Sequence, residues 1–221
     1  MPNNLTFAEA ASLPLVLLTA IQAFTEKVQI RPGDKVFIQG GAGGAGSIAV
    51  QVSKYLGATV ATTVSTKNVE LARQLGADVV VDYRTQRYED HVRDYDVVLD
   101  TLGKGETVRS MSVLRPGGTV VSLAGDPDAD FARQVGRPFL VPVMWALGAK
   151  VRREAKKRGV NYRFLFMRAH GGQLADYSAA IEAGKIKPLV GHIFPFAELE
   201  EALKLSASGK SNPGKIVVEM E

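Results

Sequence analysis

Cysteine is absent from the 221 residues of this sequence. The chain therefore forms no disulfide, holds no metal through thiolates and has no cysteine nucleophile, and this composition fits a reducing compartment. Histidine occurs only three times, and the positions His91, His170 and His192 match no metal-ligand spacing. The sequence also offers no Ser-His-Asp set, carboxylate pair or metal-ligand cluster that would support a hydrolase.

Long apolar runs and a strong charge of one sign are missing too. Residues 139–149 form an apolar run that is too short to span a bilayer and contains Pro142. The first residues lack the basic region and apolar core of a signal peptide. The net charge of +4 is too small to indicate nucleic acid binding, and the basic residues 150–158 favour a solvated helix face. We therefore predict a cytoplasmic protein with neither membrane nor nucleic acid as a partner.

What the sequence does contain is a regular alternation of strand and helix patterns. Strands are expected at residues 36–39, 59–64, 78–82, 95–101, 119–123, 162–167 and 215–219. Helices are expected at residues 15–26, 47–56, 68–75, 107–114, 172–183 and 196–206, with loop and helix over 126–161. Continuous β-branched strands are typical of parallel strands covered by helices on both faces. We therefore predict an α/β fold with a doubly wound parallel sheet, that is, a Rossmann fold.

Residues 35–46, KVFIQGGAGGAG, join an apolar strand to a helix pattern through a glycine cluster. Within it, Gly41, Gly43 and Gly46 have the GxGxxG spacing of dinucleotide-binding turns. The first glycine permits the tight turn, the second lets backbone approach a pyrophosphate, and the third lets helix and strand pack closely. Because a strand and a helix pattern flank the glycines, we expect the turn to bind a dinucleotide with its phosphates at the helix N-terminus.

The residues after the second expected strand distinguish NAD from NADP. In NAD sites a carboxylate about 20 residues past the glycines usually binds the ribose hydroxyls. Residues 61–68, ATTVSTKN, hold no carboxylate, and after the expected strand ends at residue 64 they offer the hydroxyls of Ser65 and Thr66 and one cation, Lys67. Hydroxyls and an ammonium bind a 2′-phosphate that a carboxylate would repel, so the expected cofactor is NADP(H). The open alternative is a helix N-cap followed by a solvated lysine.

Taken in order, these segments resemble the medium-chain dehydrogenase/reductase superfamily, in its zinc-less quinone-oxidoreductase-like branch. The similarity runs along nearly the whole chain, through EAASLPLVLLTA, GDKVFIQGGAGGAGSIAVQVSK, LGADVVVDYR, DVVLDTLG, LRPGGTVVSLAG, GKIKPLVGHIFPFAELEEAL and GKIVVE. It implies NADPH-dependent reduction of a quinone, enal or enone by hydride transfer, without a metal. Leu15 stands near the position where zinc-dependent relatives place a cysteine ligand, which agrees with a zinc-free site.

The resemblance also implies cofactor contacts by matching position. The pyrophosphate would lie against the turn formed by Gly41, Gly43, Gly44, Ala45 and Gly46. The 2′-phosphate and adenosine would lie among Ser65, Lys67 and Tyr83. The remaining implied contacts are Thr19, Leu102, Gly103, Ala124, Gly125 and Phe166. For Tyr83 and Phe166 plain packing on the sheet surface is the open alternative, and no catalytic residue is identified.

In that family a catalytic domain precedes the segment that residues 5–20 resemble. We therefore expect residues 1–27 to be a remnant of a truncated catalytic domain, 28–171 an NADP-binding Rossmann domain, and 172–221 the C-terminal segment of the catalytic domain. Apolar side chains of that segment would be exposed and would favour a homo-oligomer. Two alternatives stay open: a non-catalytic NADPH-binding remnant or sensor, and a class I methyltransferase, in which LRPGG before a strand also occurs.

Overall fold

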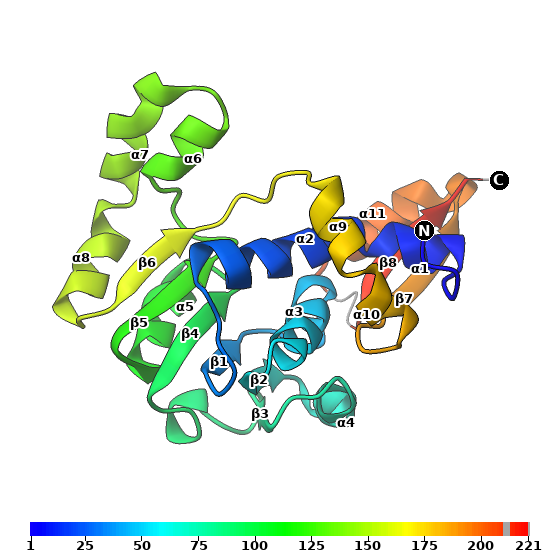
Figure 1. Cartoon of the computed structure of the whole chain (residues 1–221), viewed down its shortest axis with the longest axis horizontal. Helices are drawn as coiled ribbons and strands as arrows, with labels where there is room; N and C mark the ends of the chain where they lie inside the picture. Colours follow the sequence, from blue (N-terminus) through cyan, green and yellow to red (C-terminus); the bar gives the residue numbers. More distant parts are fainter. Residues whose placement is uncertain (210–212, 221) are drawn as a thin grey trace.

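The computed structural model describes residues 1–209 and 213–220, and a six-stranded parallel sheet forms its centre (Figure 1). The strands are β1 (Lys35–Ile38), β2 (Thr59–Val64), β3 (Val79–Asp82), β4 (Tyr95–Asp100), β5 (Leu114–Ser122) and β6 (Asn161–Phe164). They are ordered β3-β2-β1-β4-β5-β6, and every pairing is parallel. This is the strand order of the doubly wound dinucleotide-binding fold, so the predicted fold class is confirmed.

Helices cover both faces of this sheet because alternate strand residues point to opposite sides. On β1, Val36 and Ile38 join the core beneath α2 (Pro14–Gln22) and α3 (Gly44–Tyr55). Phe37, between them, belongs to the core on the other face. The helices on that second face are α5 (Gly105–Ser110) and α8 (Ala149–Lys157), while α4 (Val69–Gln74) packs on β2 and β3.

The remaining elements are short. They are α1 (Phe7–Ser12), η1 (Ala23–Lys27), η2 (Thr66–Asn68), η3 (Tyr88–Asp90), η4 (Met111–Val113), α6 (Ala129–Gln134), η5 (Pro138–Leu140), α7 (Val141–Leu147), α9 (Gly171–Asp176), α10 (Ser178–Glu182), η6 (Phe196–Glu198) and α11 (Leu199–Ala207). Residues 172–183, expected as one helix, form the two helices α9 and α10. Residues 115–118, expected as a turn before β5, lie inside that strand, where its register against β4 shifts.

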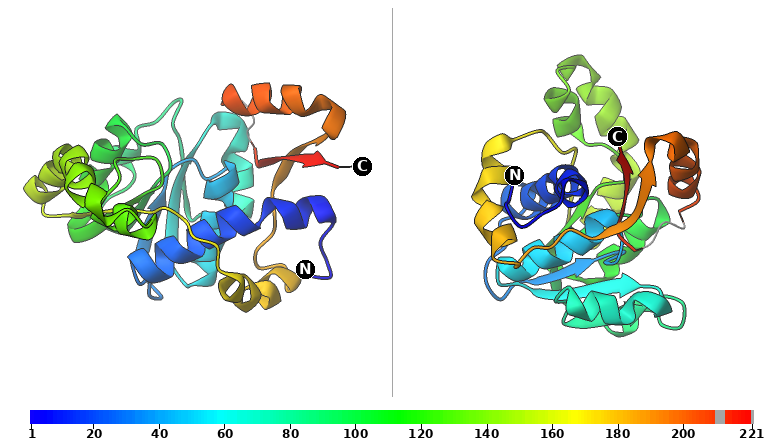
Figure 2. Two further views of the ribbon diagram at one scale, coloured as in Figure 1. Left: turned by 90° about the horizontal axis from the view of Figure 1, so that it is seen from above. Right: turned by 90° about the vertical axis from the view of Figure 1, so that its right-hand side faces the viewer.

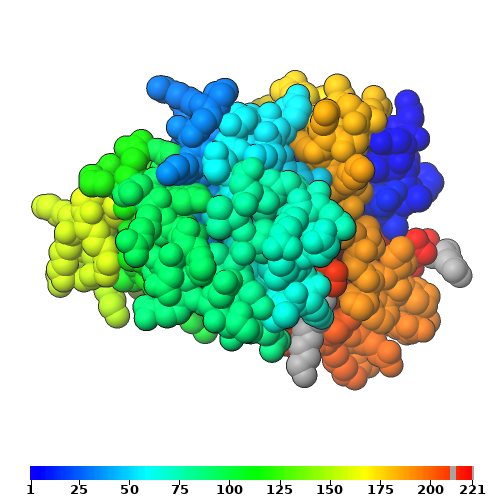
Figure 3. Space-filling model, turned by 90° about the horizontal axis from the view of Figure 1, so that it is seen from below, coloured from blue at the N-terminus to red at the C-terminus, as the bar shows by residue number. Residues whose placement is uncertain are grey.

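A separate two-stranded parallel sheet pairs β7 (Val190–Pro195) with β8 (Lys215–Glu219). The strand β8 is predicted with its observed bounds, but β7 is not predicted. Gly191, His192 and Pro195 interrupt the β-branched pattern of β7, and none of its residues is buried. Helix α1 packs against this small sheet, so both chain ends lie at the same end of the molecule (Figures 2 and 3).

The domain boundaries at residues 27 and 171 stay predictions, and residues that follow the second boundary pack against the N-terminal helices. Ala180, Ile181 and Ile186, which follow the second boundary, share one core with α2 and α3. Gln51 of α3 also accepts from the Lys187 backbone at 2.8 Å and donates to its carbonyl at 2.9 Å. The helical stretch Phe7–Lys27 is long and apolar enough to cross a membrane, but 61% of its most apolar window is buried in the fold.

An ion pair links η1 to the chain segment that follows β6. Arg168, which follows β6, donates to both carboxylate oxygens of Glu26 in η1, at 2.6 and 2.8 Å. Gln173 donates to the same carboxylate at 2.7 Å. These hydrogen bonds, that from Arg168 first, lower the pKa of Glu26. The contacts therefore link the N-terminal helices to the chain that leaves the sheet.

The lowered pKa of Glu26 predicts a pH-dependent stability. A depressed carboxyl pKa contributes stability above the unfolded-state value, and this contribution is lost as the pH falls through the folded-state value. Glu26→Gln should lower the free energy of unfolding near neutral pH by less than about 1 kcal/mol, because both partners are partly exposed. The difference from the parent should shrink as the pH falls below about 4.3, the ordinary glutamate value, and should vanish once the pH is below the lowered folded-state pKa of Glu26. Urea unfolding across pH measures this. A difference in the free energy of unfolding that does not change with pH would contradict the stabilising role of the Glu26 carboxylate. An equal effect from Glu201→Gln, which alters an exposed side chain, would contradict it too.

Candidate nucleotide-binding site

The glycine turn connects β1 to α3, as the sequence predicts. Gly40 begins it with φ of +69°, a conformation that favours glycine. A Cβ on Gly41 would collide with the Thr62 side chain of β2, and one on Gly46 with the backbone carbonyl of Gly40. Helix α3 therefore packs directly on the turn, and no side chain caps its N-terminus at Gly43. The amides of its first turn have no intrahelical partner, which is the arrangement that binds phosphate.

Neighbouring strands hold the turn in place. The Gly40 amide donates to the Thr63 hydroxyl at 3.1 Å, and the Gly41 amide donates to the Thr63 carbonyl. On the other side, the Thr101 hydroxyl donates to the Gln39 carbonyl at 2.9 Å. Because all six strands are parallel, the segments that follow β1, β2, β4 and β5 lie at this one edge of the sheet, where α/β proteins bind ligands.

The structure brings Ser65, Lys67 and Tyr83 together, as the resemblance implies. The Tyr83 amide donates to the carbonyl of Val64, so the loops after β2 and β3 lie side by side. Lys67 and Tyr83 are exposed, whereas Ser65 is buried and its hydroxyl accepts from the Asn68 side chain at 3.2 Å. An exposed cation thus stands at the end of β2, where a ribose phosphate of a nucleotide on the turn would lie.

Sequence reasoning missed a carboxylate beside this position. Asp82 ends β3 almost buried, and the hydroxyl of Thr66 donates to it, which is the main cause of its lowered pKa. The backbone amide of Arg84 donates to the same carboxylate at 3.0 Å. Thr66, expected to face a phosphate, is therefore engaged by Asp82. Arg84 brings a second cation to this loop, and its position after a predicted strand was a usable signal.

Asp100 is the other residue that the sequence analysis missed. It ends β4, is fully buried, and one carboxylate oxygen accepts from the amides of Leu102 and Gly103 at 3.0 and 2.8 Å. The other oxygen accepts from the hydroxyls of Thr107 and Ser122 at 2.5 and 2.7 Å. Asp100 therefore fixes the loop after β4 and ties it to the end of β5. A carboxylate closing the apolar run VVLD was the available signal.

The loops after β4 and β5 touch each other. Gly103 has φ of +70°, and a Cβ there would collide with the backbone of Ala124. A Cβ on Gly125 would meet the side chains of Ser122 and Tyr162. Leu102, between these loops and solvent, is exposed. The predicted residues Leu102, Gly103, Ala124 and Gly125 thus lie in two loops that contact each other, with Gly103 buried against Ala124.

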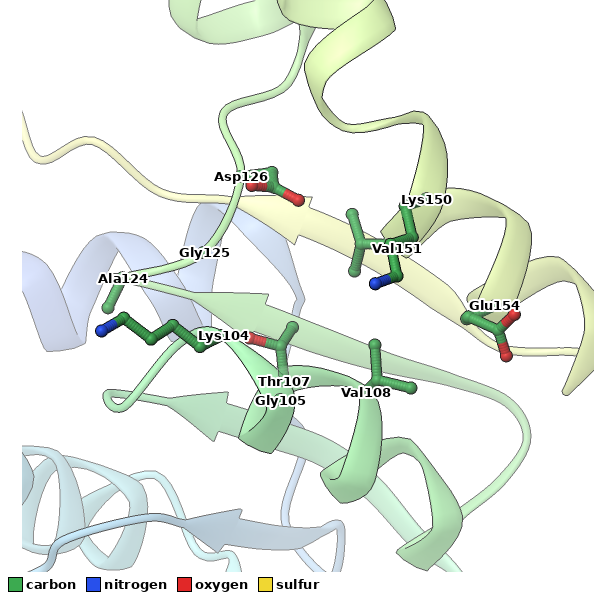
Figure 4. Close-up of a pocket in the computed structure, with 10 residues that line it drawn as sticks. All are labelled: Lys104, Gly105, Thr107, Val108, Ala124, Gly125, Asp126, Lys150, Val151 and Glu154. Atoms are coloured by element: carbon green, nitrogen blue, oxygen red, sulfur yellow. The ribbon is translucent and has the colours of Figure 1, made fainter.

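A pocket of about 650 Å³ opens beside these loops, between α5 and α8 (Figure 4). Ala124 and Gly125 form one wall, with Lys104 extending toward Ala124. Lys150 and Glu154 line it from α8. The residues that line the pocket come from Lys104 and α5, from α8 and from the loop after β5, and not from the glycine turn, so the pocket lies on the second face of the sheet.

Two predicted contacts are not brought to the turn by any hydrogen bond or ring contact of the described residues. The Thr19 hydroxyl donates to the Leu15 carbonyl one helical turn back, at 2.7 Å. Phe166 is half-exposed, and its ring packs edge-on against Phe131 of α6 at 5.1 Å between centroids. Both residues stay predictions. Over residues 1–209 and 213–220 no group of histidine and carboxylate side chains is placed to hold a metal ion.

Comparison with known proteins gives the family. A family model described as zinc-binding dehydrogenase matches residues 75–218. The chain is 34% identical to 2-methylene-furan-3-one reductase of Solanum lycopersicum, with 98% of this chain and 48% of the relative covered. It is also 34% identical to the mitochondrial NAD(P)H oxidoreductase RTN4IP1 of Mus musculus, with 98% and 57% covered. The chain thus spans about half the length of the curated relatives it matches.

Solved structures agree with this assignment. The quinone oxidoreductase from Coxiella burnetii superposes with a TM-score of 0.83 at 27% identity, and the match covers 99% of this chain and 62% of that one. The chain therefore belongs to the zinc-binding dehydrogenase family, within the medium-chain dehydrogenase/reductase superfamily.

Proposed function

We propose that this chain is the nucleotide-binding part of an NADPH-dependent oxidoreductase that reduces quinones, enals or enones without zinc. The observation that carries the proposal is the glycine turn with α3 packed directly on it and Lys67 exposed at the end of β2. The oxidoreductases among its relatives, which act on enones or quinones by name, support the substrate class.

The chain's own residues would do the binding and positioning. The turn at Gly43, Gly44 and Ala45 would receive the pyrophosphate at the N-terminus of α3, which no side chain caps. The Gly43 amide itself donates to the Gly40 carbonyl at 2.9 Å, so the donors would come from the amides that follow it. Lys67 and Arg84 would bind the 2′-phosphate, since paired cations favour a doubly charged group. The loops held by Asp100 would border the nicotinamide ribose. When bound, NADPH supplies the hydride for the reduction.

A zinc-free reaction fits the donor set that the residues offer. The sequence holds no cysteine, and the described residues form no cluster of histidines and carboxylates. His170 is already used in the fold, because its Nδ1 accepts from the Gln173 amide at the start of α9. A steady-state assay of NADPH oxidation with a quinone and an enone, with and without chelator, tests the proposal. Turnover abolished by the chelator would overturn the zinc-free mechanism.

Cofactor preference should depend on Lys67. In fluorescence titrations we expect the chain to bind NADPH more tightly than NADH. Lys67→Ala should reduce the difference in binding free energy between NADPH and NADH by about 1–2 kcal/mol, because one charge-assisted contact to the 2′-phosphate is lost. The affinity for NADH should change little. As a control, Lys185→Ala, which replaces an exposed lysine that follows α10, should leave both affinities unchanged. Equal binding of the two cofactors by the parent chain would refute the NADPH assignment.

A further inference from the structure

In the α6–α8 lobe, residues 129–158, the helices α6 and α7 stand away from the sheet at the end opposite the chain termini, while α8 packs beside β6 (Figures 1 and 2). No residue of its middle helix α7 is buried. Five large apolar side chains of the lobe are exposed to solvent. They are Val135 at 38%, Val143 at 49%, Leu147 at 56%, Trp145 at 61% and Phe139 at 73%. Contiguous exposed apolar side chains mark interaction surfaces.

The positive charge of the protein is concentrated in the same lobe. Residues 129–158 contain eight lysines and arginines, one aspartate and one glutamate, a net charge of +6. The remaining residues hold 19 basic and 21 acidic side chains, a net charge of −2. The lobe therefore carries more than the whole positive excess of the chain, whose total is +4.

Basic and apolar groups meet within the lobe. The Arg152 guanidinium of α8 lies over the ring of Trp145, 5.0 Å from its centroid, and donates to the Trp145 carbonyl. Within the described part of the chain, Arg137, Arg153 and Lys156 form no salt bridge. These charges are exposed and are not neutralised by the protein itself. The lobe thus offers an apolar tip with uncompensated cations beside it.

We propose that the α6–α8 lobe docks on an anionic lipid surface. Phe139, Trp145 and Leu147 would enter the headgroup region, where tryptophan is favoured, and the neighbouring cations would face lipid phosphates. α7 has seven residues, too few to span the bilayer, so it lies on the surface. The proposal departs from the sequence-based expectation that residues 150–158 form only a solvated face and that no membrane is a partner.

The charge and the exposed apolar side chains of the lobe favour a lipid surface over a second copy of the chain or a nucleic acid. A second copy would bring two lobes of +6 together, and like charges across an interface oppose association. Nucleic acid would satisfy the cations but would leave Phe139 and Trp145 exposed to water. An anionic membrane matches both properties, since each lysine or arginine near such a surface attracts it and the apolar side chains leave water.

The single tryptophan of the chain, Trp145, reports directly on docking. The whole chain is mixed with vesicles of phosphatidylcholine alone, or of phosphatidylcholine and phosphatidylserine in equal parts, at low and high salt. With the anionic vesicles at low salt we expect co-sedimentation and a blue shift of Trp145 emission. Salt should weaken this binding, because surface charges are screened. Phosphatidylcholine alone should bind at least about tenfold less.

Paired variants separate the two contributions. Phe139→Ala with Leu147→Ala, which keeps the reporter, should lower the vesicle partition coefficient at least about tenfold. Arg153→Glu with Lys156→Glu should lower it similarly and only for anionic vesicles. The matched controls Phe196→Ala and Lys185→Glu, exposed at the other end of the molecule, should leave partitioning unchanged.

Several results would overturn the proposal. One is the absence of both co-sedimentation and a blue shift. Another is vesicle binding of equal strength with neutral and anionic lipid, or of equal strength in the parent and the lobe variants. Light scattering in which Phe139→Ala converts a dimer to a monomer, without vesicle binding by the parent, would make the face an interface between copies. Tight binding of duplex DNA without vesicle binding would make it a nucleic acid site.

Discussion

Replacing Asp100 with alanine should lower the free energy of unfolding by about 3–5 kcal/mol. The substitution removes the acceptor for two loop amides and for two hydroxyls in a fully buried position. Each buried donor left without a partner costs about 1–3 kcal/mol, although a hydroxyl can turn to another acceptor. The loop after β4 should also lose its fixed conformation, so nucleotide affinity should fall in any molecules that stay folded.

The isosteric variant Asp100→Asn separates the hydrogen bonds from the charge. Its amide oxygen can still accept from Leu102 and Gly103, while its amide nitrogen can donate to the hydroxyls of Thr107 and Ser122 after they turn. We therefore expect a loss of only about 1 kcal/mol. Urea unfolding and fluorescence titration with NADPH measure both effects. If alanine costs no more than asparagine, the network does not hold the loop as described.

The sequence predicts the sheet well because its strands are buried. The run at residues 59–64 becomes β2 with the predicted bounds, and every residue of it after Thr59 is buried. A strand covered on both faces needs continuous apolar residues, which leaves a clear pattern. The glycine turn could also be predicted from the sequence, because Gly41 and Gly46 lie where a Cβ would collide with a neighbour and only glycine fits.

Features that depend on distant partners could not be predicted in this way. The strand β7 lies at the surface and pairs only with β8, so its sequence carries little apolar pattern. Thr66 looks available for a phosphate until the fold places Asp82 beside it. The lobe is similar: its charge is visible in the sequence, but the exposure of Trp145 is a property of the packed chain.

Replacing Gly43 with valine should weaken nucleotide binding strongly while the fold is kept. Gly43 has φ of −78° and ψ of 170°, a conformation that any residue adopts, so valine adds no backbone strain. Its branched side chain would stand where backbone amides must approach the pyrophosphate. We expect NADPH affinity to fall on the order of a hundredfold, about 2.7 kcal/mol, with Gly43→Ala falling between valine and the parent.

Gly46→Val provides the contrasting variant. A Cβ at this position collides with the Gly40 carbonyl, which is backbone and cannot turn aside, so α3 must move off β1. Gly46→Val should therefore lower the free energy of unfolding by about 1–3 kcal/mol or more, whereas Gly43→Val should leave it nearly unchanged. Thermal unfolding and NADPH titration of both variants decide the matter. A Gly43→Val protein that still binds NADPH like the parent would show that the turn is only structural.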